Sequence, residues 1–298
     1  MMSITGNRVV FLGAHKNPSF LVESFQVPKE EDLREGEILL KVRLATVCGS
    51  DLTTLEGRRT TPVPSILGHE AVGEVVCSRR TTDNFSAGDR VSFTIYDFCG
   101  RCHSCRDGLP QKCEHLMKGA GLLGLYGCAL LHETGYSRVY CQDVNTERLR
   151  FVPKFNGIPS DIYSTFSESP TGNHPKAGTA DVVVEVCGDS GSFTKGLSLL
   201  RPGGAYILVG MVHPDTPLNV TGEKIIRGCF TIKGVHNYSP NHLEDAIDFL
   251  ARTVDKFPYH QLVGPQFSLH SFHQAIALAR TRRFYRIAIN PTLDVADH

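Results

Sequence analysis

The stretch CEHLMKGAGLLG, residues 113–124, joins two motifs with different chemical roles. Its second half, GAGLLG, fits the pattern GxGxxG through Gly119, Gly121 and Gly124. Glycines at this spacing let the backbone turn tightly and approach a pyrophosphate group at the start of a helix. Taken alone, they also fit an ordinary turn between a strand and a helix. The first half closes a cluster of cysteines, so very few residues separate the two motifs.

That cluster is CGRCHSCRDGLPQKC, which supplies Cys99, Cys102, Cys105 and Cys113. Zinc favours four thiolates in a tetrahedron, and a closed site of this kind supports folding rather than chemistry. We therefore predict a structural zinc here, with two disulfides, free thiols or an iron–sulfur cluster as alternatives. The other six of the ten cysteines are scattered, which favours metal binding in a reducing compartment over a disulfide framework.

Length and charge narrow the functional class. A chain of 298 residues predicts two domains, and 31 basic against 31 acidic residues give no footprint of a nucleic-acid binder. No apolar run is long enough to cross a bilayer, and the first residues have no signal-peptide core. We predict a cytoplasmic protein with a small-molecule partner, no nucleic acid and no membrane association.

The pattern of strands and helices changes near Gly119. Before it, short strands are predicted over residues 7–14, 37–47, 71–76 and 89–95. After it come a helix over 122–135, strands over 137–144, 181–188 and 203–211, helices over 241–253 and 271–281, and a strand over 286–291. This order predicts a β-rich unit followed by a parallel sheet covered by helices, with residues 156–179 as a long loop.

Two further motifs carry candidate catalytic groups. CGSDL contains Cys48, Ser50 and Asp51, and GHEAVGEVV contains His69 and Glu70. Cys48 and His69, each at the end of a predicted strand, could converge on a zinc that keeps an open position for substrate. Asp51 could orient His69, and Ser50 could carry a proton away. A buried cysteine beside a core histidine is the alternative.

A carboxylate follows the glycine motif at a suitable distance. Asp143 lies nineteen residues after Gly124, at the end of a predicted strand, where it could bind both hydroxyls of an adenosine ribose. The same charge repels a 2′-phosphate, which favours NAD over NADP. Arg148 tempers this preference, because a nearby guanidinium could accommodate that phosphate.

Taken in order, CGSD, GHEAVGEVV, GDRV and the four-cysteine lobe resemble the zinc-containing medium-chain alcohol dehydrogenases, which include threonine and polyol dehydrogenases. The resemblance implies an α/β architecture. It comprises a GroES-like β-rich catalytic domain, a Rossmann-like doubly wound parallel sheet that binds NAD, and a segment returning to the first domain. Their expected ranges are 1–118, 119–254 and 255–298.

The resemblance also implies roles for individual residues. Cys48 and His69 would be ligands of a catalytic zinc, Glu70 a neighbouring or alternate ligand, and Ser50 the first hydroxyl of a proton relay. Many relatives continue that relay with a histidine where this chain has Thr53. Arg286 matches a position where relatives place a basic residue near the pyrophosphate, although a solvated surface charge is the commoner role of such a residue. Relatives are often homo-oligomers.

A long segment of those relatives has no counterpart here. Between the cysteine lobe and the glycine motif they carry the rest of the catalytic barrel, the third protein ligand of the catalytic zinc and the first Rossmann strand. This chain has EHLMK, residues 114–118, which spans at most roughly 20 Å between the flanking residues. We therefore expect an internal deletion, from a skipped exon or a gene-model error, with the first Rossmann strand missing or poorly replaced.

The predicted function follows from these motifs. It is zinc-dependent transfer of a hydride from a small alcohol to NAD. The alternative is a catalytically silent shortened form that keeps the structural zinc and nucleotide binding. A zinc-free quinone reductase of the same superfamily is disfavoured by the four cysteines.

Overall fold

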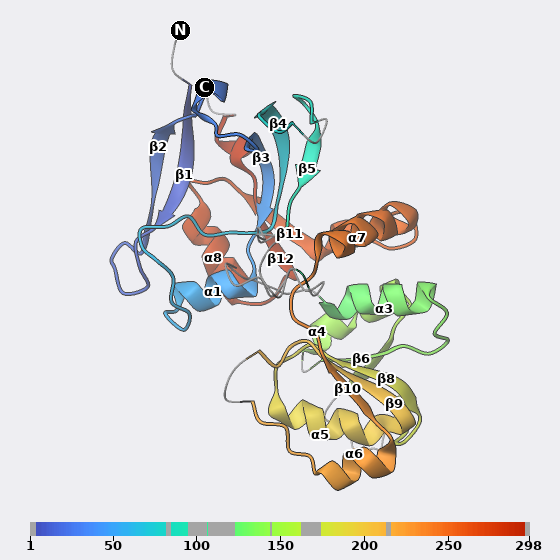
Figure 1. The fold of residues 1–298 in the computed structure, drawn as a ribbon. Coiled ribbons are helices and arrows are strands. Elements are labelled where there is room, and N and C mark those ends of the chain that lie inside the picture. Colours follow the sequence, from blue (N-terminus) through green and yellow to red (C-terminus); the bar gives the residue numbers. More distant parts are fainter. Residues whose placement is uncertain are drawn as a thin grey trace. The chain divides into compact units, whose positions relative to one another are not determined.

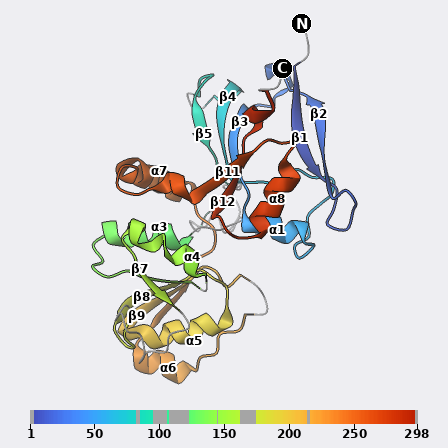
Figure 2. The same cartoon turned by 180° about the vertical axis from the view of Figure 1, so that it is seen from behind.

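The computed structural model describes residues 4–81, 85–94, 106, 123–143, 145–161, 174–212 and 216–295. The chain divides into two compact units, shown with their elements in Figures 1 and 2. Unit 1 comprises Met1–Gly121 and Tyr259–His298, and unit 2 comprises Leu122–Pro258. None of the described helices has both the length and the apolar composition needed to cross a membrane.

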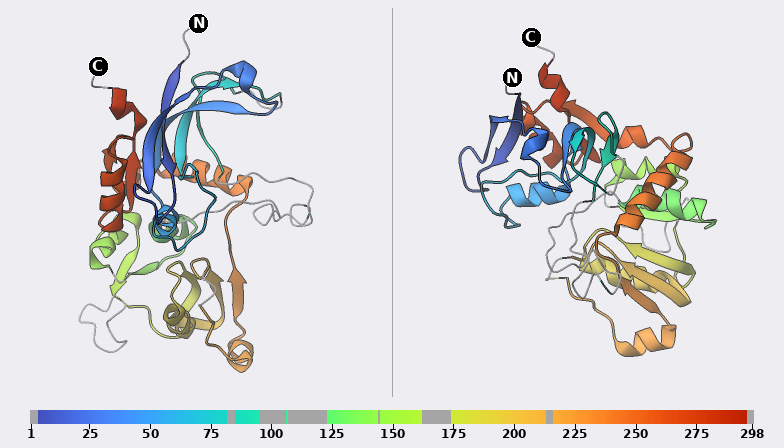
Figure 3. Two further views of the ribbon diagram at one scale, coloured as in Figure 1. Left: turned by 90° about the vertical axis from the view of Figure 1, so that its left-hand side faces the viewer. Right: turned by 45° about the horizontal axis from the view of Figure 1, so that its top comes forward.

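Unit 1 is built mainly of antiparallel strands. Its strands are β1 (Thr5–Phe11), β2 (Phe20–Gln26), β3 (Ile38–Thr46), β4 (Ala71–Ser78), β5 (Arg90–Ser92), β11 (Val263–Phe267) and β12 (Arg286–Ile289). Its described helices are η1 (Glu30–Asp32), α1 (Gly49–Leu55), η4 (Tyr259–Leu262), α8 (Phe272–Arg280) and η5 (Pro291–Val295). β1 and β2 form a hairpin, and the other five strands form a sheet in the order β11-β12-β3-β4-β5. In Figure 3 the C-terminal strands and α8, in red, lie with the blue strands of the N-terminal region.

The core of unit 1 follows from the alternation of its strands. Gly73 and Val75 of β4 are buried while the residues between and beside them are more exposed. A side chain at Gly73 would lie 3.1 Å from Leu40 Cβ on the neighbouring strand, so this close strand pairing favours glycine. The buried core between the sheet, α1 and α8 is closed by Phe11, Val47, Leu55, Ile276, Ile287 and Ile289.

Unit 2 alternates helices and parallel strands. Its strands are β6 (Tyr140–Asp143), β7 (Ile158–Asp161), β8 (Ala180–Glu185), β9 (Leu200–Leu208) and β10 (Thr231–Gly234). Its described helices are α3 (Leu123–Glu133), α4 (Thr146–Leu149), η3 (Val152–Phe155), α5 (Ser190–Leu199), α6 (Gly222–Gly228) and α7 (Pro240–Thr253). α5 packs on β8 and β9, where Phe193 and Leu197 contact the buried ring of Tyr206 (Figure 1).

The parallel strands of unit 2 form two separate sheets. One contains β6 and β7, and the other has the order β10-β9-β8. Within the described residues no strand pairs with both β6 and β8. In a Rossmann order the first strand occupies the place between these two sheets.

One strand contradicts the sequence prediction. Ile158–Asp161 was expected to lie in a long loop, yet it forms β7 and pairs in parallel with β6. Proline and aspartate both disfavour strands, so the sequence of Ile158–Asp161 did not predict one. Pro159 is tolerated because, among the described strands, β7 has a neighbour on one side.

Candidate metal centre and coenzyme site

Cys48 lies where β3 gives way to α1. The residue before it, Val47, donates its backbone N–H to the carbonyl of Ile287 at 2.9 Å, which fixes this corner against β12. Cys48 caps the helix, its side chain is fully buried, and its backbone N–H donates to Asp51 Oδ2 at 2.9 Å. Burial raises the pKa of the Cys48 thiol, and the negative charge of Glu70 raises it further. A metal ion that binds this sulfur must therefore displace its proton.

His69 approaches from the residues that precede β4. Its Nε2 lies 3.3 Å from Ser50 Oγ, and its Nδ1 lies 3.6 Å from Asp51 Oδ1. Burial raises the pKa of the Asp51 carboxyl, while the N–H of Cys48 and the imidazole of His69 offset part of that shift. The two ring nitrogens thus have different neighbours, as expected of an imidazole that binds a metal through one nitrogen and is oriented through the other.

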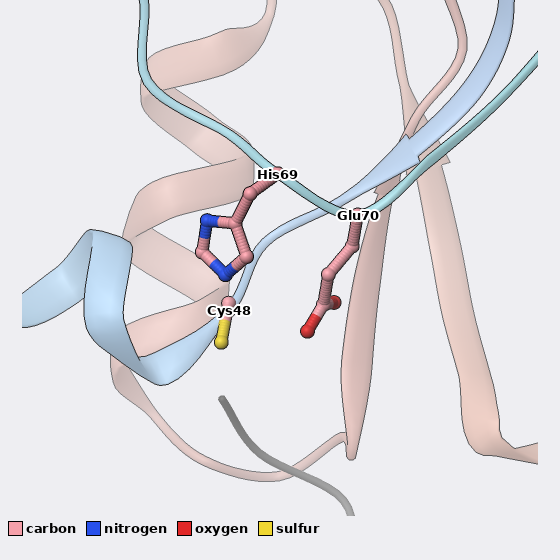
Figure 4. Close-up of side chains that lie close together, drawn as sticks. All are labelled: Cys48, His69 and Glu70. Carbon is pink, nitrogen blue, oxygen red and sulfur yellow. The ribbon is translucent and has the colours of Figure 1, made fainter. Parts of the chain in front are cut away.

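Glu70 completes the group. Figure 4 shows its carboxylate, the imidazole of His69 and the sulfur of Cys48 directed toward one region. The donor atoms of these three residues lie within 4.8 Å of one another, and in the described part of the chain they are the one such group of three or more. Thiolate sulfur and imidazole nitrogen are both ligand types that zinc favours in proteins, so the chemistry of Cys48 and His69 suits zinc.

The carboxylate of Glu70 already has strong partners. Arg286 donates from Nε to Oε2 at 2.8 Å and from Nη2 to Oε1 at 2.9 Å, and Thr46 Oγ1 donates to Oε2 at 2.5 Å. Burial acts to raise the pKa of Glu70, but the hydrogen bonds and charge of Arg286, with the Thr46 hydroxyl, hold it below its ordinary value. Glu70 is therefore an ionised group held by a guanidinium rather than an unengaged ligand.

Arg286 contradicts one alternative offered by the sequence. Its residue exposure is 8%, so it is not a solvated surface charge. Antiparallel pairing of β12 with β3, with Ala288 opposite Thr46, brings it beside Glu70. The sequence predicted neither this pair nor the role of Thr46, because no local pattern links Glu70 to Arg286, 216 positions away. A role of Arg286 near a pyrophosphate stays a prediction.

The hydroxyl of Thr53 has a local role. It donates to the backbone carbonyl of Ser50 at 2.8 Å, and at 3.2 Å to that of Gly49. The hydroxyl of Thr53 is therefore bound to backbone carbonyls of α1, whereas the hydroxyl of Ser50 lies beside the imidazole of His69.

Several predicted residues lie outside the described residues. They are Cys99, Cys102, Cys105, Cys113, Gly119 and Gly121. Gly124 lies in the first turn of α3, and an added Cβ would meet Cys141 Sγ at 3.7 Å, an ordinary contact. At this position the described structure therefore leaves room for alanine.

Asp143 ends β6, as the motif predicted. Its Oδ1 accepts a hydrogen bond from the backbone N–H of Asn145 at 2.8 Å, and its Oδ2 lies 3.9 Å from Arg148 Nη1. Asn145 caps α4 by accepting from the N–H groups of Glu147 and Arg148. The cap and the ion pair hold the carboxylate and the guanidinium together at the carboxyl end of the strand.

Comparison with known proteins assigns the family. The model of the alcohol dehydrogenase GroES-like domain matches residues 34–143, and that of the zinc-binding dehydrogenases matches residues 123–252. The L-threonine 3-dehydrogenase of Proteus mirabilis is 22% identical, with 87% of this chain and 93% of that protein covered.

Solved structures agree on the fold. An alcohol dehydrogenase from Thermotoga maritima superposes with a TM-score of 0.83 at 19% identity, covering 97% of this chain and 100% of that one. An alcohol dehydrogenase from Escherichia coli, complexed with NADH, gives 0.79 at 17% identity, covering 97% and 100%. The fold is thus GroES-like and Rossmann-like, and the chain belongs to the zinc-containing medium-chain alcohol dehydrogenase family, whose members use zinc and a nicotinamide coenzyme on small molecules.

Proposed function

We propose that this chain transfers a hydride from a small primary or secondary alcohol to NAD, at a rate reduced by an incomplete metal site. The observation that carries the proposal is the convergence of Cys48, His69 and Glu70, with Ser50 and Asp51 behind the imidazole. Cys48 and His69 would hold the zinc, and zinc when bound supplies Lewis-acid activation of the alcohol hydroxyl.

The residues around the cluster have distinct tasks in this proposal. Ser50 offers a hydroxyl beside His69 and would accept the substrate proton at Oγ while its own hydroxyl proton passes outward to water. Asp51 keeps the imidazole oriented. Arg286 and Thr46 keep Glu70 ionised and turned toward them, so Glu70 would become a ligand by giving up its strongest contacts.

The preference for NAD is part of the proposal. Asp143 suits the hydroxyls of an adenosine ribose, and its charge opposes a 2′-phosphate. Arg148 already lies near that carboxylate, at 3.9 Å, so a phosphate would have to compete for it. We further propose functional boundaries at 1–118, 119–254 and 255–298, a structural zinc on the four-cysteine lobe, and a homo-oligomer.

An internal deletion accounts for the reduced rate. The alignment with the Proteus mirabilis enzyme is 324 positions long, more than the 298 residues of this chain, so that enzyme has residues without counterparts here. The separation of β6–β7 from β8–β10 supports loss of the first Rossmann strand. The same facts favour a second candidate, a silent form that binds zinc and nucleotide without oxidising alcohols.

Zinc content and turnover separate these candidates. We would measure zinc per chain by mass spectrometry and NAD reduction with primary alcohols, secondary alcohols, polyols and L-threonine, the last because of the named relatives. The enzyme proposal expects two zinc ions per chain and slow NAD reduction that Cys48→Ser abolishes. Binding of NADH without reduction of NAD by any alcohol would instead establish the silent form, and turnover unchanged in Cys48→Ser would overturn the proposed site.

A further inference from the structure

Glu185, the last residue of β8, has a buried carboxylate whose hydrogen-bond partners are three backbone N–H groups and the thiol of Cys187. The residue is 4% exposed, and the ion pairs formed within the described part of unit 2 use other carboxylates. Its Oε1 accepts the N–H of Cys187 at 2.7 Å and that of Gly188 at 2.5 Å, and its Oε2 accepts the N–H of Gly210 at 3.2 Å. One side chain thus binds the segments that follow both β8 and β9.

These two segments touch backbone to backbone. Gly188 has a φ of +78°, and a Cβ there would lie 2.8 Å from Gly210 O. A Cβ on Gly210 would lie 2.5 Å from the carbonyl carbon of Val186. The Glu185 backbone carbonyl also accepts the N–H groups of Val209 and Gly210, at 3.0 and 3.1 Å. Glu185 therefore fixes the separation of the two loops through both its side chain and its backbone.

The position of these two loops in the sheet indicates what the contacts of Glu185 do. Dinucleotides bind outside the carboxyl ends of the strands in open α/β sheets, one nucleotide to each half. The acidic residue that binds the adenosine ribose belongs to the half containing β6, where Asp143 lies. β8, β9 and β10 form the other half, so the loops held by Glu185 lie where the nicotinamide nucleotide is expected to bind.

We propose that Glu185 is a positioning residue for the nicotinamide half of the coenzyme, acting through the backbone of residues 187–188 and 210. This inference rests on the proposed NAD-linked function and deepens it. Glu185 need not touch the coenzyme: it holds the surface that does. Because its effect is confined to one half of the nucleotide, NADH and ADP-ribose should respond differently to its loss.

The test compares Glu185→Gln, which keeps the shape but replaces one acceptor oxygen by a donor, with Asp181→Asn. Asp181 lies on the same strand, exposed and paired with Arg201, which makes it the matched control. Calorimetry of the full chain measures binding of NADH and of ADP-ribose, which lacks the nicotinamide. We expect about tenfold weaker NADH binding in Glu185→Gln, with ADP-ribose within about twofold and the control unchanged.

A second measurement needs no substitution. Cys187 is exposed and lies in the loop after β8 that Glu185 binds. NADH should therefore slow the alkylation of Cys187 by iodoacetamide in the unsubstituted chain, and ADP-ribose should not. Equal loss of affinity for both ligands, or a Cys187 that bound NADH leaves unprotected, would overturn the inference while leaving NAD binding intact. An unsubstituted chain that binds neither ligand would refute the proposed function and this inference with it.

Discussion

Replacing Arg286 by methionine removes the counter-charge of Glu70 and tests how that carboxylate is held. The guanidinium makes two charge-assisted hydrogen bonds, at 2.8 and 2.9 Å, and its side chain is 9% exposed. Removing one partner of a buried ion pair costs about 3–5 kcal/mol. Glu70 is 26% exposed, so water can compensate part of that loss and the lower end applies. We expect the free energy of unfolding of unit 1 to fall by about 3 kcal/mol.

Urea unfolding followed by circular dichroism, at a fixed zinc concentration, measures this change. A domain of about 160 residues, the size of unit 1, loses roughly 2–4 °C of melting temperature per kcal/mol, so calorimetry should show a drop of about 6–12 °C. A double-mutant cycle with Glu70→Gln isolates the pair, because coupled residues deviate from additivity by more than about 0.5 kcal/mol.

The matched control is the pair of Arg43 and Glu74, which also joins an arginine to a glutamate across unit 1. Their side chains are 37% and 31% exposed, so Arg43→Met should cost at most about 1 kcal/mol. Equal losses in Arg43→Met and Arg286→Met, or an additive cycle, would show that burial of the Glu70 pair carries no special stability.

Four further substitutions test other parts of the molecule. Cys48→Ser should remove one zinc ion per chain by mass spectrometry, because a serine hydroxyl does not replace a thiolate ligand; unchanged zinc content would exclude Cys48 as a ligand. Gly157→Ala should lower stability in urea by about 1–3 kcal/mol, since its Cβ would lie 2.7 Å from two side-chain atoms, whereas Gly127→Ala, in open space on α3, should raise it by about 0.4–1 kcal/mol. Asp143→Asn should shift the ratio of NADP to NAD affinities by about tenfold toward NADP in calorimetry, and an unchanged ratio would remove Asp143 from the coenzyme site.

The elements that the sequence predicted have strong periodic patterns. α7 and α8 show helical spacing of apolar residues, and β3 and β4 each contain several β-branched residues. β7 was missed because Ile158 is its single strand-favouring residue. Local pattern therefore identified these four elements, whose own side chains specify them, and it failed at β7, where pairing with a neighbouring strand does so. It also missed β2 and α5.

The candidate site divides in the same way. Cys48, His69 and Glu70 come from two short motifs, so their type and spacing revealed them, and the structure brings their donor atoms together. The partner of Glu70 depends on β12 lying beside β3, a pairing between the two ends of the chain. Sequence reasoning had no local signal for that contact, since an arginine in a C-terminal strand is compatible with many partners.

The two consequences of the proposed deletion differ in severity. In unit 1 the described residues add no third thiol or imidazole to the cluster, yet Arg286 and Thr46 satisfy the partly buried carboxylate of Glu70 without a metal. In unit 2 the inner edges of β6 and β8 have backbone groups that no other described strand pairs, and such groups cost free energy when water is excluded. Restoring the segment between Cys113 and Gly119 should therefore stabilise unit 2 more than unit 1. It should change the affinity for the coenzyme more than it changes the strength of the ion pair between Arg286 and Glu70.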